Sequence, residues 1–150
     1  MIPRIYVDTS VFGGCFDEEY KTESLRLFED VRNGKFILVI STVTVEELDR
    51  APKHVQRVLA DLPEKQVEII EFSDRIGQLR DAYVQANILD VAHHADAEHI
   101  ASASVAEVDF VVSWNFRHIV HYDKIAGFQR INVIKGYHAI AIYSPKEVVE

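Results

Sequence analysis

The sequence has a single cysteine, Cys15, among its 150 residues, so an internal disulfide framework is excluded. Such sparing use of cysteine suits a reducing compartment. No apolar run approaches the length needed to cross a bilayer, and charged residues interrupt every segment. The first residues also lack a basic stretch followed by an apolar stretch and a cleavage site. We therefore expect a cytoplasmic protein with no membrane partner.

Positive charge is scarce as well, because 16 Lys and Arg residues stand against 24 Asp and Glu residues, for a net charge of −8. A protein that coats DNA presents a basic surface, and this composition argues against that class. An enzyme that acts on nucleic acid stays open. Carboxylates that bind divalent cations add formal negative charge, and the bound ion reverses the local sign.

Repeats, low-complexity stretches and linkers are all missing from the chain. Nearly half of the residues are hydrophobic, which is typical of a globular protein rather than a disordered one. A chain of this length can bury most of a core. We therefore predict one domain over residues 1–150.

Short apolar runs alternate with segments of helical periodicity along the chain. The runs predict strands over residues 5–8, 35–40, 66–70, 108–113 and 139–145. The periodic segments predict helices over residues 18–33, 41–51, 53–62, 73–87, 93–107, 122–135 and 145–149. Strands that alternate with helices indicate right-handed βαβ units. The predicted fold is α/β, a three-layer α/β/α sandwich with a mainly parallel central sheet.

Polar side chains fall at or beside the ends of these strands. Asp8 ends the first strand, and Asn115 follows the strand over residues 108–113. Glu47 and Asp96 lie on helices next to two strands. Open parallel sheets bind ligands at the carboxyl ends of their strands. Oxygen ligands that converge from several segments are what Mg²⁺ or Mn²⁺ requires.

Each of these residues also has a purely structural interpretation. Asp8 could bond the backbone two residues on, although a carboxylate that abuts a buried strand needs a partner. The segment from Thr44 to Glu47 fits a capping box, in which Glu47 would only start a helix. Glu46 is expected to face outward and to pair with Arg50. An asparagine such as Asn115 is common in turns.

The helix over residues 93–107 carries the segment "HHADAEH". Asp96 shares a face with Ile100, so its carboxylate stands at the start of an apolar stripe that should face the core. His93, His94 and His99 crowd around it, but the spacing matches no zinc motif and no second cluster exists. We expect partly exposed histidines, with His99 lining the same cleft as Asp96.

Four motifs in this order carry a resemblance to a known family: "VDTSV", "VTVEEL", "ADAEHIASAS" and "VDFVVSWNFRHI". Over essentially the whole chain, the sequence resembles the PIN domain, a family that includes the VapC-type toxins of toxin–antitoxin systems. The resemblance implies an endoribonuclease that depends on Mg²⁺ or Mn²⁺. It also implies an RNA substrate, a cognate antitoxin and a homodimer.

Carried over to this sequence, the resemblance implies a catalytic set of Asp8, Glu47, Asp96 and Asn115. The metal ligands among them are Asp8, Glu47 and Asp96. Asn115 stands where the family usually has a fourth acid. Thr9, Ser10 and Ser113 are expected to support the site, and Gly13-Gly14 to form a flexible turn beside it.

An ion held by such a cluster would relieve the repulsion between the carboxylates and polarise a scissile phosphate. Candidate contacts to the RNA are Lys53, Arg57, Arg117 and His118, each of which could equally be a solvated surface group.

Two other functions remain open. A phosphotransferase could use Asp8 as nucleophile, but position 10, where a second acid is usually needed, is Ser10. A catalytically weakened PIN-like module that binds RNA or protein is the other alternative. It is suggested by Asn115, which stands where the family usually has a fourth acid.

Overall fold

The centre of the molecule is a five-stranded sheet in which every neighbouring pair is parallel. The computed structural model describes all residues 1–150. The strands are β1 (Arg4–Val7), β2 (Ile37–Ser41), β3 (Val67–Ile70), β4 (Phe110–Val112) and β5 (Ile142–Tyr143). They lie in the order β3-β2-β1-β4-β5, so β1 is central and the order reverses between β1 and β4. In open α/β sheets a ligand binds beside such a reversal, at the carboxyl ends of the strands.

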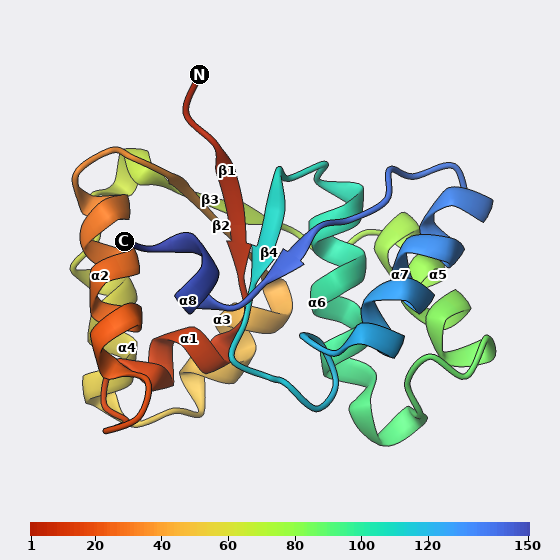
Figure 1. Cartoon of the computed structure of the whole chain (residues 1–150), viewed down its shortest axis with the longest axis horizontal. Coiled ribbons are helices and arrows are strands. Elements are labelled where there is room, and N and C mark those ends of the chain that lie inside the picture. Colours follow the sequence, from red (N-terminus) through yellow and green to blue (C-terminus); the bar gives the residue numbers. More distant parts are fainter.

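Helices cover both faces of the sheet, which makes the fold a three-layer α/β/α sandwich (Figure 1). The structure contains the expected helices, and their ends differ from the predicted ends by only a few residues. They are α2 (Lys21–Arg32), α3 (Thr42–Asp49), α4 (Lys53–Ala60), α5 (Asp74–Gln85), α6 (His94–Val105), α7 (Tyr122–Ile134) and α8 (Pro145–Val148). No helix is long and apolar enough to cross a membrane.

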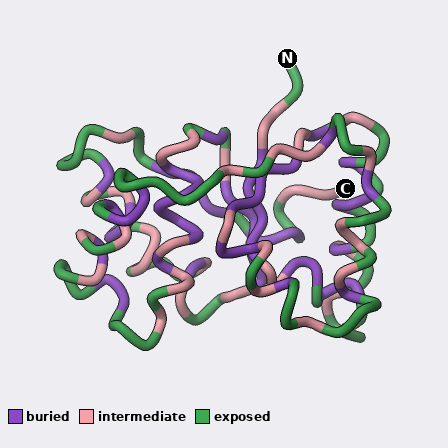
Figure 2. Tube along the Cα trace, turned by 180° about the vertical axis from the view of Figure 1, so that it is seen from behind, coloured by how far each residue is buried: buried purple, intermediate pink, exposed green.

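Two separate apolar cores explain why the strands are hydrophobic throughout. Successive side chains of a strand point to opposite faces of a sheet. Tyr6 of β1 packs with helices α5, α6 and α7, whereas Ile5 and Val7 pack with α1 (Thr9–Gly14), α2 and α4. Both faces of the sheet are therefore dry, as the buried central strands show (Figure 2).

One helix was not expected from the sequence: α1 (Thr9–Gly14) begins directly after Asp8. The prediction that Gly13-Gly14 forms a flexible turn is wrong, because both residues belong to this helix. At Gly14 a Cβ atom would come within 2.5 Å of Ser24 Oγ and 2.8 Å of Trp114 Nε1. Gly14 is therefore needed for close packing, not for flexibility.

Candidate active site at the carboxyl edge of the sheet

Asp8 stands at the point where β1 ends and α1 begins, in the middle of the carboxyl edge of the sheet. It is only 4% exposed, and its Oδ1 accepts a hydrogen bond of 2.6 Å from the Ser10 hydroxyl. Although Asp8 is the residue before the helix, its side chain makes no capping hydrogen bond. The structural interpretation of Asp8 as a backbone cap is therefore not supported.

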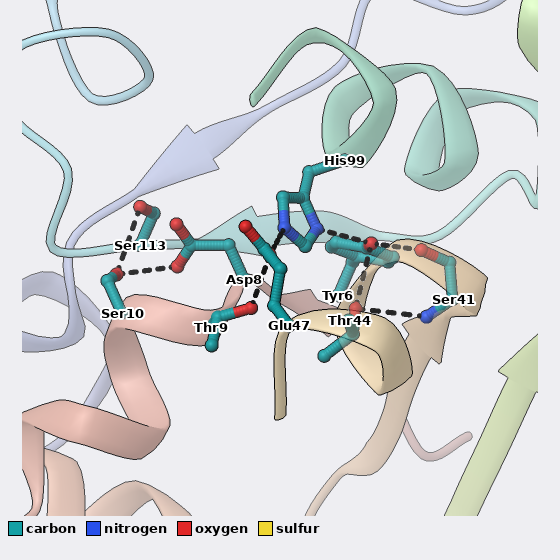
Figure 3. A network of polar contacts seen from close by, with 9 residues as sticks. All are labelled: Tyr6, Asp8, Thr9, Ser10, Ser41, Thr44, Glu47, His99 and Ser113. Atoms are coloured by element: carbon teal, nitrogen blue, oxygen red, sulfur yellow. Dashed lines mark hydrogen bonds and ion pairs between the residues drawn. The ribbon is translucent and has the colours of Figure 1, made fainter. Parts of the chain in front are cut away.

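Glu47 lies on α3, which follows β2, and its carboxylate points toward the same edge (Figure 3). Its Oε1 accepts the Thr9 hydroxyl at 2.6 Å and lies 2.6 Å from His99 Nε2. Both contacts end on Oε1, so Oε2 has no protein donor.

The capping box that would have explained Glu47 is formed one turn earlier. The Thr44 hydroxyl accepts the backbone N–H of Ser41, so Glu47 has no capping role. Glu46 is exposed, as expected, but it forms no ion pair with Arg50. Of the two neighbouring acids, only Glu47 therefore belongs to the site.

A buried polar chain holds the far side of Glu47. His99 is 1% exposed, and its Nδ1 lies 2.7 Å from the Tyr6 hydroxyl, which is in turn 2.7 Å from Ser41 Oγ. The expectation that His99 is partly exposed is wrong, since its ring is buried between the Glu47 carboxylate and the Tyr6 hydroxyl (Figure 3). Through this chain, α6, β1 and the start of α3 fix one another and the Glu47 carboxylate.

Asp96 enters the site from the first turn of α6, one turn before His99. Its half-buried carboxylate accepts no hydrogen bond, and its nearest basic group is His118 Nδ1, 3.5 Å from Oδ2. The His118 ring packs against the ring of His93, with 3.7 Å between centroids. The structure thus brings the predicted RNA contact His118 to the predicted metal ligand Asp96.

The three acids lie close enough for the charge of one to change the pKa of another. Burial raises the pKa of Asp8 above its ordinary value, and the charge of Asp96 adds to this, although His99 and nearby hydroxyls oppose it. Burial likewise raises the pKa of Asp96, with a further contribution from Glu47. A nearby cation stabilises the charged form of carboxylates whose pKa is raised in this way.

The pKa of Glu47 is lowered and that of His99 is raised, because the two side chains contact each other. Burial alone would raise the pKa of Glu47, but the hydrogen bond and charge of His99, with the Thr9 bond, lower it. Burial would lower the pKa of His99, yet the bond to Glu47 and the charges of Asp8, Glu47 and Asp96 raise it. The acids around His99 therefore favour its positively charged form.

The segment after β4 closes the site on its other side. Ser113 Oγ lies 3.5 Å from Ser10 Oγ beside Asp8, and it accepts the backbone N–H of Asn115 at 2.9 Å. The Asn115 carboxamide oxygen accepts the backbone N–H of His118 at 2.9 Å. The amide at the fourth position therefore shapes its own turn.

The remaining basic candidates differ in position. Lys53 and Arg57 are exposed on α4. Arg57 lines a surface hollow of about 280 Å³ with residues of α2 and α4 and of the turn that follows α1, and none of the three site acids lines it. Arg117 is exposed in the loop after β4, between Asn115 and His118. Of the three, only Arg117 is placed beside the site by the contacts of its own loop.

The donor set fits a sparsely coordinated hard cation better than an enclosed one. No three His, Cys, Asp or Glu side chains lie close enough together to enclose a metal ion. Mg²⁺ is usually bound by only one or two carboxylates, together with waters and substrate phosphates. Glu47 Oε2 and the Asp96 carboxylate, which have no protein donor, suit that arrangement.

The comparison with sequence families agrees with the geometry. A family described as PIN domain matches residues 4–117, which is more than half of the chain. This chain belongs to the PIN domain family. No curated protein matches the sequence.

Solved structures share the fold at low sequence identity. A toxin–antitoxin complex from Klebsiella pneumoniae is 22% identical, with a TM-score of 0.56 over 76% of this chain and 88% of that one. FitAcB from Neisseria gonorrhoeae is 14% identical, with a TM-score of 0.60 over 95% and 98%. VapBC2 from Rickettsia felis, bound to a promoter DNA fragment, is 15% identical, with a TM-score of 0.56 over 94% and 98%.

Sequence reasoning missed two buried members of the polar network, Tyr6 and His99, whereas Ser10 was expected as a supporting donor and does donate to Asp8. A signal for His99 was present, because it lies one turn after Asp96 on the apolar face of its helix. Tyr6 carried no such signal, because its side chain reads as one more apolar residue of a buried strand.

Proposed function

We propose that this chain is an endoribonuclease that depends on Mg²⁺ or Mn²⁺ and hydrolyses phosphodiester bonds. The observation that carries the proposal is the convergence of Asp8, Glu47 and Asp96 from three separate segments on the switch point of the sheet. The charge of Asp96 raises the pKa of Asp8, and the charge of Glu47 raises the pKa of Asp96. A bound cation would relieve this repulsion. Membership of the PIN domain family supports the same assignment.

In this proposal the ion lies among the three acids and is held directly by one or two of them with waters and the substrate phosphate, and Thr9 and His99 orient Glu47 for that purpose. When bound, a divalent ion supplies Lewis-acid stabilisation of the negative charge on the phosphate. Ser10 and Ser113 hold the Asp8 carboxylate in place, while Arg117 and His118 contact the RNA backbone beside the cut. Asn115 orders the loop that carries them.

The proposed partners are an RNA substrate, a cognate antitoxin and a second copy of the chain. The toxin–antitoxin composition of the similar structures supports the antitoxin. A small upstream reading frame that encodes a DNA-binding protein would support it further. The single cysteine supports a cytoplasmic setting.

A catalytically weakened RNA- or protein-binding module is the second candidate. It is favoured by one observation, the neutral Asn115 whose carboxamide oxygen is already bonded to the His118 N–H. This candidate predicts RNA binding without turnover.

The experiment that separates the candidates incubates the purified chain with mixed cellular RNA in Mg²⁺, in Mn²⁺ and in EDTA. Single-stranded DNA of matched sequence serves as the control substrate. Cleavage of RNA that requires the ion supports the enzyme. RNA binding without cleavage in any ion supports the binding module and contradicts the enzyme.

A further inference from the structure

The loop from Trp114 to His118 runs along the rim of the acidic cluster and is tied to it at both ends. The backbone N–H of Trp114 donates to Ser10 Oγ at 3.0 Å, and the same hydroxyl donates to Asp8 at 2.6 Å. At the other end, His118 lies 3.5 Å from Asp96. Any residue at the tip of this loop is therefore held between two of the acids that are proposed to act on the phosphate.

The tip of the loop presents an aromatic ring and a cation to solvent. Phe116 is 44% exposed, and Arg117 next to it is exposed as well. Two hydrogen bonds inside the loop fix the tip: Phe116 N–H to Trp114 O at 2.9 Å and His118 N–H to Asn115 Oδ1 at 2.9 Å. Single exposed apolar residues are common on proteins, so the exposure of Phe116 by itself indicates nothing.

The support beneath Phe116 sets it apart from the other exposed apolar residues. Trp114 is 4% exposed, its Nε1–H donates to Ser24 Oγ at 2.7 Å, and Gly14 gives it room. The Tyr20 ring stacks on Trp114 with 4.2 Å between centroids. The Phe116 ring then meets Trp114 edge-on at 6.1 Å. An ordered aromatic stack, rather than a lone side chain, therefore borders the site.

We propose that Phe116 is a stacking platform for one unpaired base next to the scissile phosphate, and that Arg117 contacts the phosphate that follows. This inference rests on the proposed ribonuclease function, and it assigns a residue that selects single-stranded substrate. Every base offers a π-face, so an aromatic ring beside a phosphate-cleaving site binds single strands without requiring a particular sequence.

The charges around the stack set the direction of the strand. Asp17 and Glu19 place negative charge at Tyr20, which disfavours a phosphate on that side of the platform. Arg117 is exposed and follows Phe116 in the loop, next to His118, which lies 3.5 Å from Asp96. The base therefore lies over the aromatic stack, and the sugar–phosphate chain passes on the Arg117 side.

The test compares Phe116→Ala with Phe116→Trp, and uses Phe72→Ala as the matched control. Phe72 is 46% exposed, but it follows β3 at an edge of the sheet and lies in none of the contacts described above. The cut site is first mapped in a single-stranded RNA. Two short oligoribonucleotides are then made around it, one intact and one with an abasic ribose at the nucleotide beside the cut.

With the unsubstituted chain, we expect the abasic oligonucleotide to raise KM by about 5- to 100-fold, the range that base–aromatic stacking gives. Phe116→Ala raises KM for the intact oligonucleotide by a similar factor and shows no further penalty for the abasic one. Phe116→Trp restores the difference in KM between the intact and the abasic oligonucleotide, and Phe72→Ala behaves as the unsubstituted chain. The value of kcat changes little in all three.

Equal cleavage of the intact and abasic oligonucleotides by the unsubstituted chain overturns the inference while leaving the ribonuclease function in place. An abasic penalty that persists in full in Phe116→Ala overturns it as well, because another group then reads the base. A failure of the proposed function is a different result, in which the unsubstituted chain cleaves no RNA in either ion. In that case fluorescence anisotropy with the unsubstituted chain compares an intact single-stranded oligoribonucleotide with one that carries abasic riboses throughout, neither of which needs a mapped cut site, and equal affinities overturn the inference.

Discussion

His99 Nε2 lies 2.6 Å from Glu47 Oε1, at the bottom of the acidic cluster and out of contact with solvent. The imidazole thus contacts the one carboxylate of the cluster whose pKa is lowered, and this contact raises the pKa of His99 in turn. The other contact of the ring, with the Tyr6 hydroxyl, ties this pair to the central strand. Glu47 is therefore oriented before any ion arrives, with Oε2 directed to the site.

Replacement of His99 tests this positioning. We expect His99→Gln to weaken Mn²⁺ binding by about 10- to 100-fold, because groups that orient metal ligands contribute on that scale. Calorimetric titration with Mn²⁺ measures the affinity, and the dependence of cleavage on Mn²⁺ concentration should shift equally. His138→Gln, at an exposed position, is the control. An unchanged Mn²⁺ affinity in folded His99→Gln would show that Glu47 does not need its histidine.

Asp8→Asn should stabilise the metal-free protein while it removes activity. Burial makes the charged form of Asp8 unfavourable, whereas an amide keeps the shape and can still accept the Ser10 bond. We expect a higher melting temperature in EDTA, by about 2–4 °C for each kcal/mol gained. Excess Mn²⁺ should narrow the gap, since only the unsubstituted chain gains from it. A lower melting temperature for Asp8→Asn in EDTA would contradict the prediction that the buried charge of Asp8 destabilises the metal-free protein.

The same pair of proteins predicts a pH dependence. In the folded chain the pKa of Asp8 is raised, so the folded state keeps a proton that the unfolded state has already released. Its contribution to the free energy of unfolding therefore falls as pH rises from about 4 to the raised pKa, and then levels off. Urea denaturation in EDTA over a pH series should show the advantage of Asp8→Asn growing across that window. Parallel curves for the two proteins would show that Asp8 titrates normally.

The two glycines of α1 form a matched pair for testing the packing beneath the site. Gly14→Ala should destabilise the fold by about 1–3 kcal/mol, because its Cβ would collide with Ser24 and Trp114. Gly13→Ala meets nothing within 4 Å and should gain about 0.5–1 kcal/mol from its better helix propensity. Urea denaturation measures both. Equal effects of the two substitutions would contradict the close contact between α1 and Trp114.

Asn115 offers a test of the fourth position. Asn115→Asp keeps an oxygen for the His118 N–H and adds a negative charge beside the cluster, so we expect tighter Mn²⁺ binding. Asn115→Ala removes the turn bond and should cost about 1 kcal/mol of stability. Calorimetry and urea denaturation separate the two effects. An Asn115→Asp variant with unchanged Mn²⁺ affinity would place residue 115 outside the ion's reach.

The fold could be predicted from the sequence because its strands are apolar throughout and alternate with helices. That pattern permits few arrangements other than a parallel sheet covered on both faces. α1 was missed because "DTSVFGG" combines turn residues with two glycines, and local propensity there favours a turn. Tertiary packing of Gly14 against Trp114 decides the helix instead, and no local pattern carries that information.

At the candidate site, the sequence predicted the position of the acids and of the hydroxyls of Thr9, Ser10 and Ser113, but not the buried contacts of His99. Asp8, Glu47 and Asp96 stand next to strand ends in the sequence, and parallel strands bring their carboxyl ends to one edge. The partners of these acids come from long-range contacts, such as His99 with Glu47 and Trp114 with Ser10. Only the folded chain shows which hydroxyl or ring nitrogen lies within hydrogen-bond distance.

The central claim is that Asp8, Glu47 and Asp96 form a cation-binding cluster that cleaves RNA. Its most direct test is the rate of Mn²⁺-dependent RNA cleavage by the unsubstituted chain and by Asp8→Asn, with circular dichroism to show that both are folded. We expect cleavage by the former and only the EDTA background by the latter. Equal cleavage by the two proteins would contradict it.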